Sequence, residues 1–272
     1  MQRLEYKYLV PAWALGDIRR QISPFVVQDS HMRWPAGYAI RSIYFDTGDL
    51  DYYYQKESGI QYRRKLRVRG YGEWAEDALA FLEIKRKDNM AIAKARAPFY
   101  FKDCKALFAS GDLGRYIHNP GEDPQVLQDG QSFFFHMYRY SLMPIILVCY
   151  EREAFFGQYN PTLRVTLDKN LRSASFPQPG ELYSEMRQRR SLENHFILEV
   201  KFNGGMPGWL KGLLENYQLE RQALSKYCIC LDEHRIPQRS TAFSTWAFSP
   251  REALSRSPCR ETSLPGRSEA AG

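Results

Sequence analysis

The sequence has no apolar run long enough to cross a membrane as a helix. Its longest apolar stretch, Leu142 to Tyr150, is about half of the ~20 residues that a bilayer requires. The first residues, MQRLEYKYLV, mix charged with apolar side chains and lack the continuous apolar region of a secretory signal. We therefore expect a soluble cytoplasmic protein without a membrane span. Coupling to transport would require a membrane or transporter subunit that the sequence does not identify.

Cysteine is scarce, and its spacing excludes two common frameworks. The five cysteines are odd in number and include no CxxC pair, which argues against a disulfide scaffold and against a zinc site. A glycine-rich phosphate-binding loop of the Walker A type is absent as well. We expect reduced thiols.

The overall composition is that of an ordinary globular protein with a positive charge. Of the 272 residues, 44% are hydrophobic and 25% are charged, and the formal net charge is +7. This charge favours a polyanionic partner and leaves nucleic acid, membrane lipid and phosphate ligands open. From Arg235 onward the chain is rich in Ser, Pro, Arg and Gly, with six arginines and three glutamates. We predict one domain over residues 1–235 and a disordered basic tail over 236–272.

Ionic and apolar residues alternate along most of the chain, with the period of two that is typical of β-strands. The predicted strands are 3–9, 38–47, 61–71, 78–87, 90–99, 142–156, 162–171 and 196–202. Helical spacing predicts helices over 11–22, 49–58, 103–110 and 124–140, after Pro207 and from Ser225. The strand 61–71 is the most charged, because four cations share one of its faces: Arg63, Lys65, Arg67 and Arg69.

Periodicity alone does not decide which face of these strands is buried. In an ordinary sandwich or barrel the apolar faces form the core and the ionic faces are exposed to solvent. A closed sheet with helices outside would instead turn the ionic faces inward. Burying so many like charges costs several kcal/mol each, unless a polyanion or abundant water neutralises them. A phosphate chain would meet that requirement.

Nine short segments favour the second arrangement by a resemblance to a known family. In chain order they are RLEYKYL, YAIRSIYFDT, RRKLRVRGYG, FLEIKRK, AKARAP, YEREAF, LRVTLD, ILEVKF and LSKY. This ordered set, over roughly residues 3–231, resembles the polyphosphate polymerase (VTC) domains, which belong with the CYTH proteins in the triphosphate tunnel metalloenzyme superfamily. The resemblance implies an α+β, mainly β fold: an eight-stranded antiparallel β-barrel, the triphosphate tunnel, with helices packed outside.

The resemblance also implies which residues bind phosphate and metal. The phosphate-binding set, to which we add Lys201 because it shares the face of Glu199, is Lys7, Arg63, Lys65, Arg67, Arg69, Lys85, Lys94, Arg96, Arg152, Arg164, Lys201 and Lys226. The implied catalytic residues are Arg67, Arg69, Lys85, Arg164 and Glu199. Glu199 is the expected chief metal ligand, with Glu5 and Glu83 as further candidates. Such hard oxygen ligands select Mn²⁺ or Mg²⁺.

One departure from the superfamily pattern narrows the expected activity. CYTH enzymes carry an ExExK signature on the first strand, whereas Arg3 stands here at the first acidic position, followed by Glu5 and Lys7. The loss of a metal-binding carboxylate favours the polymerase-like branch over adenylate cyclase or thiamine triphosphatase. We therefore expect metal-dependent transfer of a phosphoryl group from ATP, or another triphosphate, to inorganic polyphosphate.

Two other functions stay open, and a third is disfavoured. Hydrolysis of tripolyphosphate or a nucleoside triphosphate would use the same residues. A non-catalytic polyphosphate-binding sensor would fit the incomplete first-strand signature. Nucleic acid is not expected as a partner, because basic residues confined to a tunnel cannot reach a duplex.

Overall fold

Eight long strands form the framework of the part of the chain that the computed structural model describes, residues 3–32, 37–88, 91–119, 121 and 123–236. Their bounds are β1 Arg3–Pro11, β3 Tyr38–Asp46, β4 Arg63–Tyr71, β5 Leu79–Asp88, β6 Ala91–Tyr100, β7 Met143–Gly157, β8 Arg164–Ser175 and β10 His195–Asn203. Each corresponds to a predicted strand. Two short strands, β2 Val26–Gln28 and β9 Arg189–Arg190, were not predicted, since neither is long enough to show a period.

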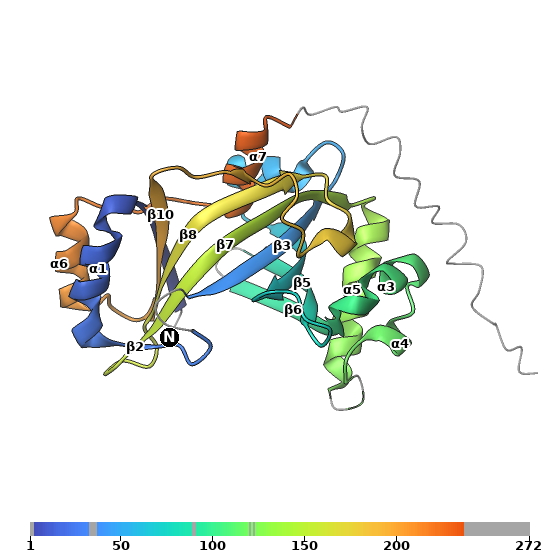
Figure 1. Cartoon of the computed structure of the whole chain (residues 1–272), viewed down its shortest axis with the longest axis horizontal. Helices are drawn as coiled ribbons and strands as arrows, with labels where there is room; N and C mark the ends of the chain where they lie inside the picture. The colour runs from blue at the N-terminus through green and yellow to red at the C-terminus, as the bar shows by residue number, and fades with distance from the viewer. Residues whose placement is uncertain (1–2, 33–36, 89–90, 120, 122, 237–272) are drawn as a thin grey trace, which may run out of the picture.

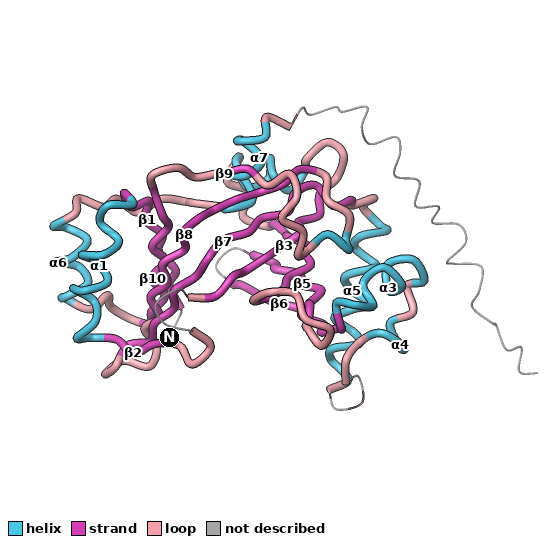
Figure 2. The backbone as a smooth tube through the Cα atoms, in the orientation of Figure 1, coloured by secondary structure: helices cyan, strands magenta, loops and turns pink. Residues whose placement is uncertain are grey.

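The strands pair in one curved antiparallel sheet (Figure 2). The order along the sheet is β1-β10-β8-β7-β3-β4-β5-β6, with β2 on β7 and β9 on β8. The predicted fold class is confirmed, but the barrel is only approximate. Within the described residues β1 and β6 are the two ends of the sheet and do not pair with each other. Side chains reach across this opening, because Lys85 Nζ of β5 lies 3.9 Å from Glu5 Oε2 of β1.

Seven α-helices flank the sheet within the described residues. They are α1 Leu15–Ile22, α2 Asp51–Glu57, α3 Cys104–Ser110, α4 Leu113–Tyr116, α5 Pro124–Arg139, α6 Gly208–Asn216 and α7 Lys226–His234. All but the one-turn α4 match predicted helices. The longest, α5, starts where the sequence provides a cap: the Asp123 carboxylate accepts a hydrogen bond from the Gln125 amide, and Pro124 needs no amide partner. No described helix is both long and apolar enough to span a bilayer.

The helices cover the apolar faces of the strands at the two ends of the sheet (Figure 1). Helices α1 and α6 pack on β1, β10 and β8, where Ile18 and Leu210 join a core that includes Leu198. Helices α3 and α5 pack on β3 to β6, where Phe133 joins a core that includes Leu66. The apolar faces are therefore turned outward, against helices. This settles the question that periodicity left open, because the ionic faces must then line the concave side.

Helix α7 packs on the concave side itself. Its residues Tyr227, Cys228 and Leu231 contact an apolar patch that includes Val148 of β7 and Ile40 of β3. Among the described cysteines none forms a disulfide, as expected from their spacing. The predicted tail, 236–272, lies outside the described residues except for position 236, so its disorder stays a prediction.

Candidate functional site

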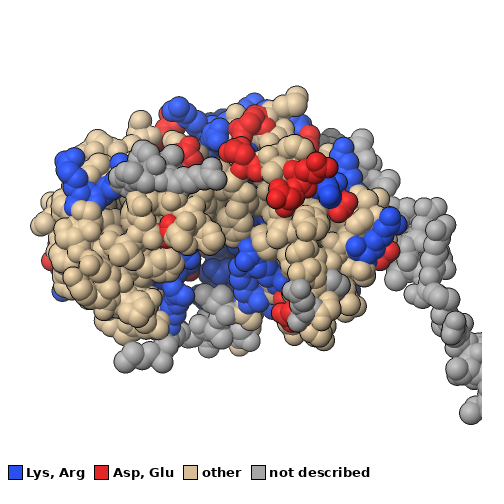
Figure 3. Space-filling view, turned by 60° about the horizontal axis from the view of Figure 1, so that its bottom comes forward, with Lys and Arg blue, Asp and Glu red and all other residues tan. Residues whose placement is uncertain are grey.

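The ionic faces of the strands surround a cavity of about 660 Å³. Eleven cations and three glutamates line it: Lys7, Lys56, Arg63, Lys65, Arg67, Arg69, Lys85, Lys87, Arg152, Lys201 and Lys226, with Glu5, Glu57 and Glu199. Figure 3 shows lysine and arginine side chains gathered in a hollow at the centre of one face. The lining residues carry an excess of eight positive charges, which calls for an anionic ligand or bound water.

The pairing of β4 with β5 explains why so many cations meet. In their antiparallel register Arg63 faces Lys87, and Lys65 faces Lys85. Residues directly opposite each other on paired strands point to the same side of the sheet, so each pair brings two like charges together. Such pairs repel each other unless an anion lies between them. This part of the wall therefore favours a bound anion. Without one, the repulsion between the paired cations destabilises the fold.

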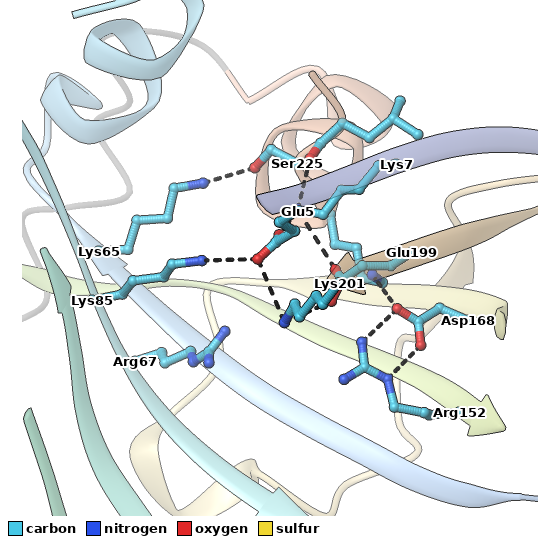
Figure 4. Close-up of polar contacts among 12 residues, drawn as sticks. Glu5, Lys7, Lys65, Arg67, Lys85, Arg152, Asp168, Glu199, Lys201 and Ser225 are labelled. Carbon is cyan, nitrogen blue, oxygen red and sulfur yellow. Dashed lines mark hydrogen bonds and ion pairs between the residues drawn. The ribbon is translucent and has the colours of Figure 1, made fainter. Parts of the chain in front are cut away.

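Two glutamates and two lysines form a compact ionic group where β1 pairs with β10 (Figure 4). Lys7 Nζ lies 2.8 Å from Glu5 Oε1 and 3.7 Å from Glu199 Oε2. Lys201 Nζ lies 2.8 Å from Glu199 Oε1 and 3.4 Å from Glu5 Oε2. Each lysine thus bridges both carboxylates, which places the two acids together as the sequence suggested.

Both carboxylates of this group are held in the ionised form. Burial would raise the pKa of Glu199, but Lys7 and Lys201 more than offset it and keep that pKa well below its usual range. Burial and the charge of Glu199 likewise oppose ionisation of Glu5, yet Lys7, Lys85 and Lys201 lower its pKa to about 2. Both acids can therefore act as anionic oxygen ligands at neutral pH.

Replacing Glu5 by glutamine should make folding stability less sensitive to acid. The pKa of Glu5 is depressed in the folded protein, so its charge stabilises the fold above the unfolded-state value of about 4.3. That contribution is lost as pH falls from there through about 2. Urea unfolding between these pH values should show a shallower decline for Glu5→Gln than for the natural protein. Equal slopes would mean that Glu5 is not paired as described.

The pair Glu5 and Glu199 fits a divalent cation better than Glu83 does. Within the described residues no group of three or more His, Cys, Asp or Glu side chains could hold a metal on its own. Mg²⁺ commonly uses only one or two carboxylates and takes its other ligands from substrate phosphates and water. The two acids supply that number of hard oxygen ligands at the cavity wall. They are the residues that would hold Mn²⁺ or Mg²⁺.

Glu83 lies outside the cavity lining and contacts three cations of the sheet. Arg67 Nη2 lies 2.7 Å from its Oε2, Lys94 Nζ lies 2.9 Å from its Oε1, and Arg96 Nε lies 3.3 Å from the same oxygen. The structure therefore brings Lys94 and Arg96 to Glu83 rather than to the cavity lining. Arg164 is also outside that lining, with Nη2 3.2 Å from Asp29 Oδ2. The other nine predicted phosphate-binding residues all line the cavity.

Asp168 of β8 is a buried acid whose role the sequence reading missed. Arg152 of β7 binds it with two hydrogen bonds, Nε–Oδ1 of 2.6 Å and Nη2–Oδ2 of 2.7 Å. Lys226, at the start of α7, lies 2.5 Å from its Oδ2. Burial opposes the charge of Asp168, but these two cations lower its pKa. The signal in the sequence was its place on the ionic side of the predicted strand 162–171.

Several other wall residues come from segments without strand alternation. Lys56 and Glu57 belong to α2, and Ser225 precedes α7 and accepts a hydrogen bond of 2.8 Å from Lys65 Nζ. Only the packing of α2 and α7 against the sheet brings these residues to the site, so strand periodicity could not find them. Tyr44 and Tyr150, in contrast, line the cavity from strands β3 and β7.

Two of the solved structures that this chain resembles are distant likenesses. A putative adenylyl cyclase from Hippeastrum, described as having a dominant triphosphatase activity, is 15% identical, with a TM-score of 0.44 over 88% of this chain and 99% of that one. A putative adenylate cyclase from Vibrio parahaemolyticus is 12% identical, with a TM-score of 0.41 over 84% of this chain and 98% of that one. Among curated proteins, no significant sequence match was found.

A protein-family model also matches most of the chain. The VTC domain model matches residues 2–233, which include every strand of the sheet and every residue of the cavity wall. The match therefore covers most of the chain and nearly all of its described part. By this match the chain belongs to the VTC domain family.

Proposed function

We propose that this protein is a metal-dependent phosphotransferase that synthesises polyphosphate from ATP. Membership of the VTC domain family and the cation-lined cavity support the broader statement, phosphoryl transfer in a triphosphate tunnel. The finer statement depends on the charge of the cavity: the lining residues carry an excess of eight, and six remain when Glu83 and Asp168, which pair with lining cations, are counted. A triphosphate carries one negative charge on each inner phosphate and nearly two on the terminal one, about four in all. A second polyanion would neutralise the remainder.

The distribution of acids along the cavity supports two polyanions in series. Glu5, Glu199 and Asp168 cluster where β1, β10 and β8 meet. Beyond Lys85 the row of cations continues along β4 and β5 with Arg63, Lys65 and Lys87, and none of these three forms an ion pair with a described carboxylate. We assign the metal-bound triphosphate to the end with Glu5 and Glu199. We assign the acceptor polyphosphate to the row of Arg63, Lys65 and Lys87, near which Glu57 of α2 is the one glutamate of the lining.

The wall residues would act by position and charge. Arg67, Arg69 and Lys85 face the space between the two proposed ligands and would stabilise negative charge on the transferred phosphoryl group. The cavity lining in the described residues contains no histidine or cysteine, so a direct transfer between the two phosphate chains fits it better than a covalent enzyme intermediate. A divalent cation held by Glu5 and Glu199 would supply charge neutralisation at bridging phosphate oxygens.

The reaction is tested by incubating the pure protein with ATP, Mn²⁺ and a short polyphosphate primer. Each transfer breaks the bond between the β- and γ-phosphates and lengthens the acceptor by one phosphate, so ADP and long-chain polyphosphate should appear together. Release of free phosphate without chain growth would support the hydrolase alternative. Tight polyphosphate binding without turnover under either Mn²⁺ or Mg²⁺ would support the sensor and reject the enzyme.

A further inference from the structure

Tyr44 places a hydroxyl group in the middle of the cationic wall. It lies on β3, directly opposite Arg67 of β4 in the strand register, and only 7% of the residue is exposed. Its ring packs against Tyr227 of α7, with the ring centroids 5.1 Å apart and the planes tilted by 32°. The sheet and α7 therefore fix the ring, and its hydroxyl group is positioned at the cavity.

The hydrogen bonds around Tyr44 leave its own proton available. Arg67 Nη1 donates to the Tyr44 hydroxyl oxygen over 3.0 Å, while Arg67 Nε donates to Glu83. Within the described residues, the Tyr44 O–H donates to no protein acceptor. The neighbouring Tyr227 differs, because its O–H donates to the Asp46 carboxylate over 2.5 Å. A nearly buried hydroxyl that accepts from an arginine and faces a cavity, with its donor unused, needs an acceptor in that cavity.

We propose that the Tyr44 hydroxyl donates a hydrogen bond to a phosphate oxygen of the ligand, with Arg67 holding the hydroxyl in place. Tyr44 then contributes a neutral donor to a wall otherwise made mainly of cations. A donor of this kind binds only while it keeps its proton, whereas Arg67 is charged at every relevant pH. The inference rests on the proposed phosphate-binding function and adds a residue to it.

The surroundings of Tyr44 make this donor sensitive to pH. Burial raises the pKa of Tyr44, but the positive charges of Arg67, Arg69 and Lys65 outweigh this effect. The pKa falls from the usual tyrosine value to about 8. A tyrosinate cannot donate, and it repels phosphate. Binding of phosphate and ionisation of Tyr44 therefore exclude each other. By linkage, a bound phosphate chain raises the pKa of Tyr44.

Other titratable groups near Tyr44 respond differently. From β4, Lys65 has its pKa lowered by burial, so its loss of charge would also weaken binding at high pH. From α7, burial raises the pKa of both Tyr227 and Cys228, so both keep their protons through the range in which Tyr44 ionises. Only a signal specific to tyrosinate separates Tyr44 from Lys65.

The test uses metal-free tripolyphosphate as the ligand and ultraviolet absorbance of tyrosinate as the signal. At about pH 9, above the pKa of about 8, adding tripolyphosphate to the natural protein should remove the absorbance of one tyrosinate. The Tyr44→Phe variant should show no such change. Calorimetry at about pH 7 should give about tenfold weaker binding for Tyr44→Phe, the effect of one hydrogen bond to a charged group. This difference should shrink towards pH 9.

The control is Tyr159→Phe, because Tyr159 is 84% exposed and lies outside the cavity lining. It should behave as the natural protein does in both measurements. If the natural protein binds tripolyphosphate without losing tyrosinate absorbance, and Tyr44→Phe binds equally well, the role of Tyr44 is rejected while the proposed function stands. If the natural protein binds neither tripolyphosphate nor polyphosphate, both proposals are rejected.

Discussion

Replacing Glu199 by glutamine should reduce ATP-dependent polyphosphate synthesis by about 100-fold or more, since even residues that only support metal ligands typically cost about 10- to 100-fold when they are replaced. Glutamine keeps the size of the side chain but removes the charge that would hold the cation. The same change raises the positive excess of the cavity from eight to nine, so metal-free tripolyphosphate should bind as tightly as before or more tightly. ADP release at increasing Mn²⁺ concentrations, with calorimetry in the absence of metal, measures the two effects separately.

The opposite directions of these effects distinguish a metal ligand from a structural residue. A Glu199→Gln variant that lost both activity and metal-free binding would indicate a damaged cavity, and one that kept full activity would show that Glu199 holds no essential metal. Glu151→Gln is the matched control, because Glu151 also lies on a strand and pairs with a lysine, Lys169. It is outside the cavity lining, so its activity should equal that of the natural protein.

The strands and their ionic faces could be predicted from the sequence because a period of two is a local property. Lys65 and Lys85 face the cavity for the same reason that they fall on one side of their own segments. The direction of that side could not be read locally. It depends on which surface the helices cover, and Ile18 and Phe133 show that they cover the apolar one. The resemblance, rather than the periodicity, indicated this.

Alternation predicts which side of a strand a residue occupies. It does not predict whether that residue lies within the length of the strand that lines the cavity. Lys94, Arg96 and Arg164 were predicted among the phosphate-binding residues, and each stands on the ionic side of its strand. Their contacts are with Glu83 and Asp29, and the cavity lining does not include them. Position relative to the cavity depends on the register and curvature of the whole sheet, which no single segment encodes.

Residues whose role depends on partners from distant segments were the ones missed. Asp168 is defined by Arg152 on β7 and Lys226 on α7. Tyr44 lies in YAIRSIYFD, a segment whose pattern is that of an apolar strand. Its proposed role depends on the hydrogen bond that its hydroxyl oxygen accepts from Arg67 on the neighbouring strand. In both cases the chemistry comes from pairs more than 15 residues apart in sequence, so composition and spacing carried no direct signal.

Replacing Asp168 by asparagine should destabilise the protein strongly. The change leaves Arg152 and Lys226 without their shared carboxylate, although their side chains are only 12% and 11% exposed. Loss of one partner of a buried ion pair typically costs about 3–5 kcal/mol. Urea unfolding at neutral pH should show a loss of this size. An unchanged midpoint would mean that the two cations reach water or another acid once Asp168 is neutral.

Polyphosphate should restore much of that lost stability, because its phosphates can replace the missing carboxylate beside Arg152 and Lys226. A ligand at about 100 times its Kd stabilises the folded state by about 2.7 kcal/mol, and the extra positive charge of Asp168→Asn should lower that Kd. The rise in melting temperature on adding polyphosphate should therefore be larger for Asp168→Asn than for the natural protein. Asp29→Asn is the control, since Asp29 pairs with Arg164 outside the cavity lining and should gain no more than the natural protein. An equal rise in melting temperature for the natural protein and both variants would place Arg152 and Lys226 away from the bound phosphate. The comparison therefore distinguishes cations that bind the ligand from cations that only neutralise a buried acid.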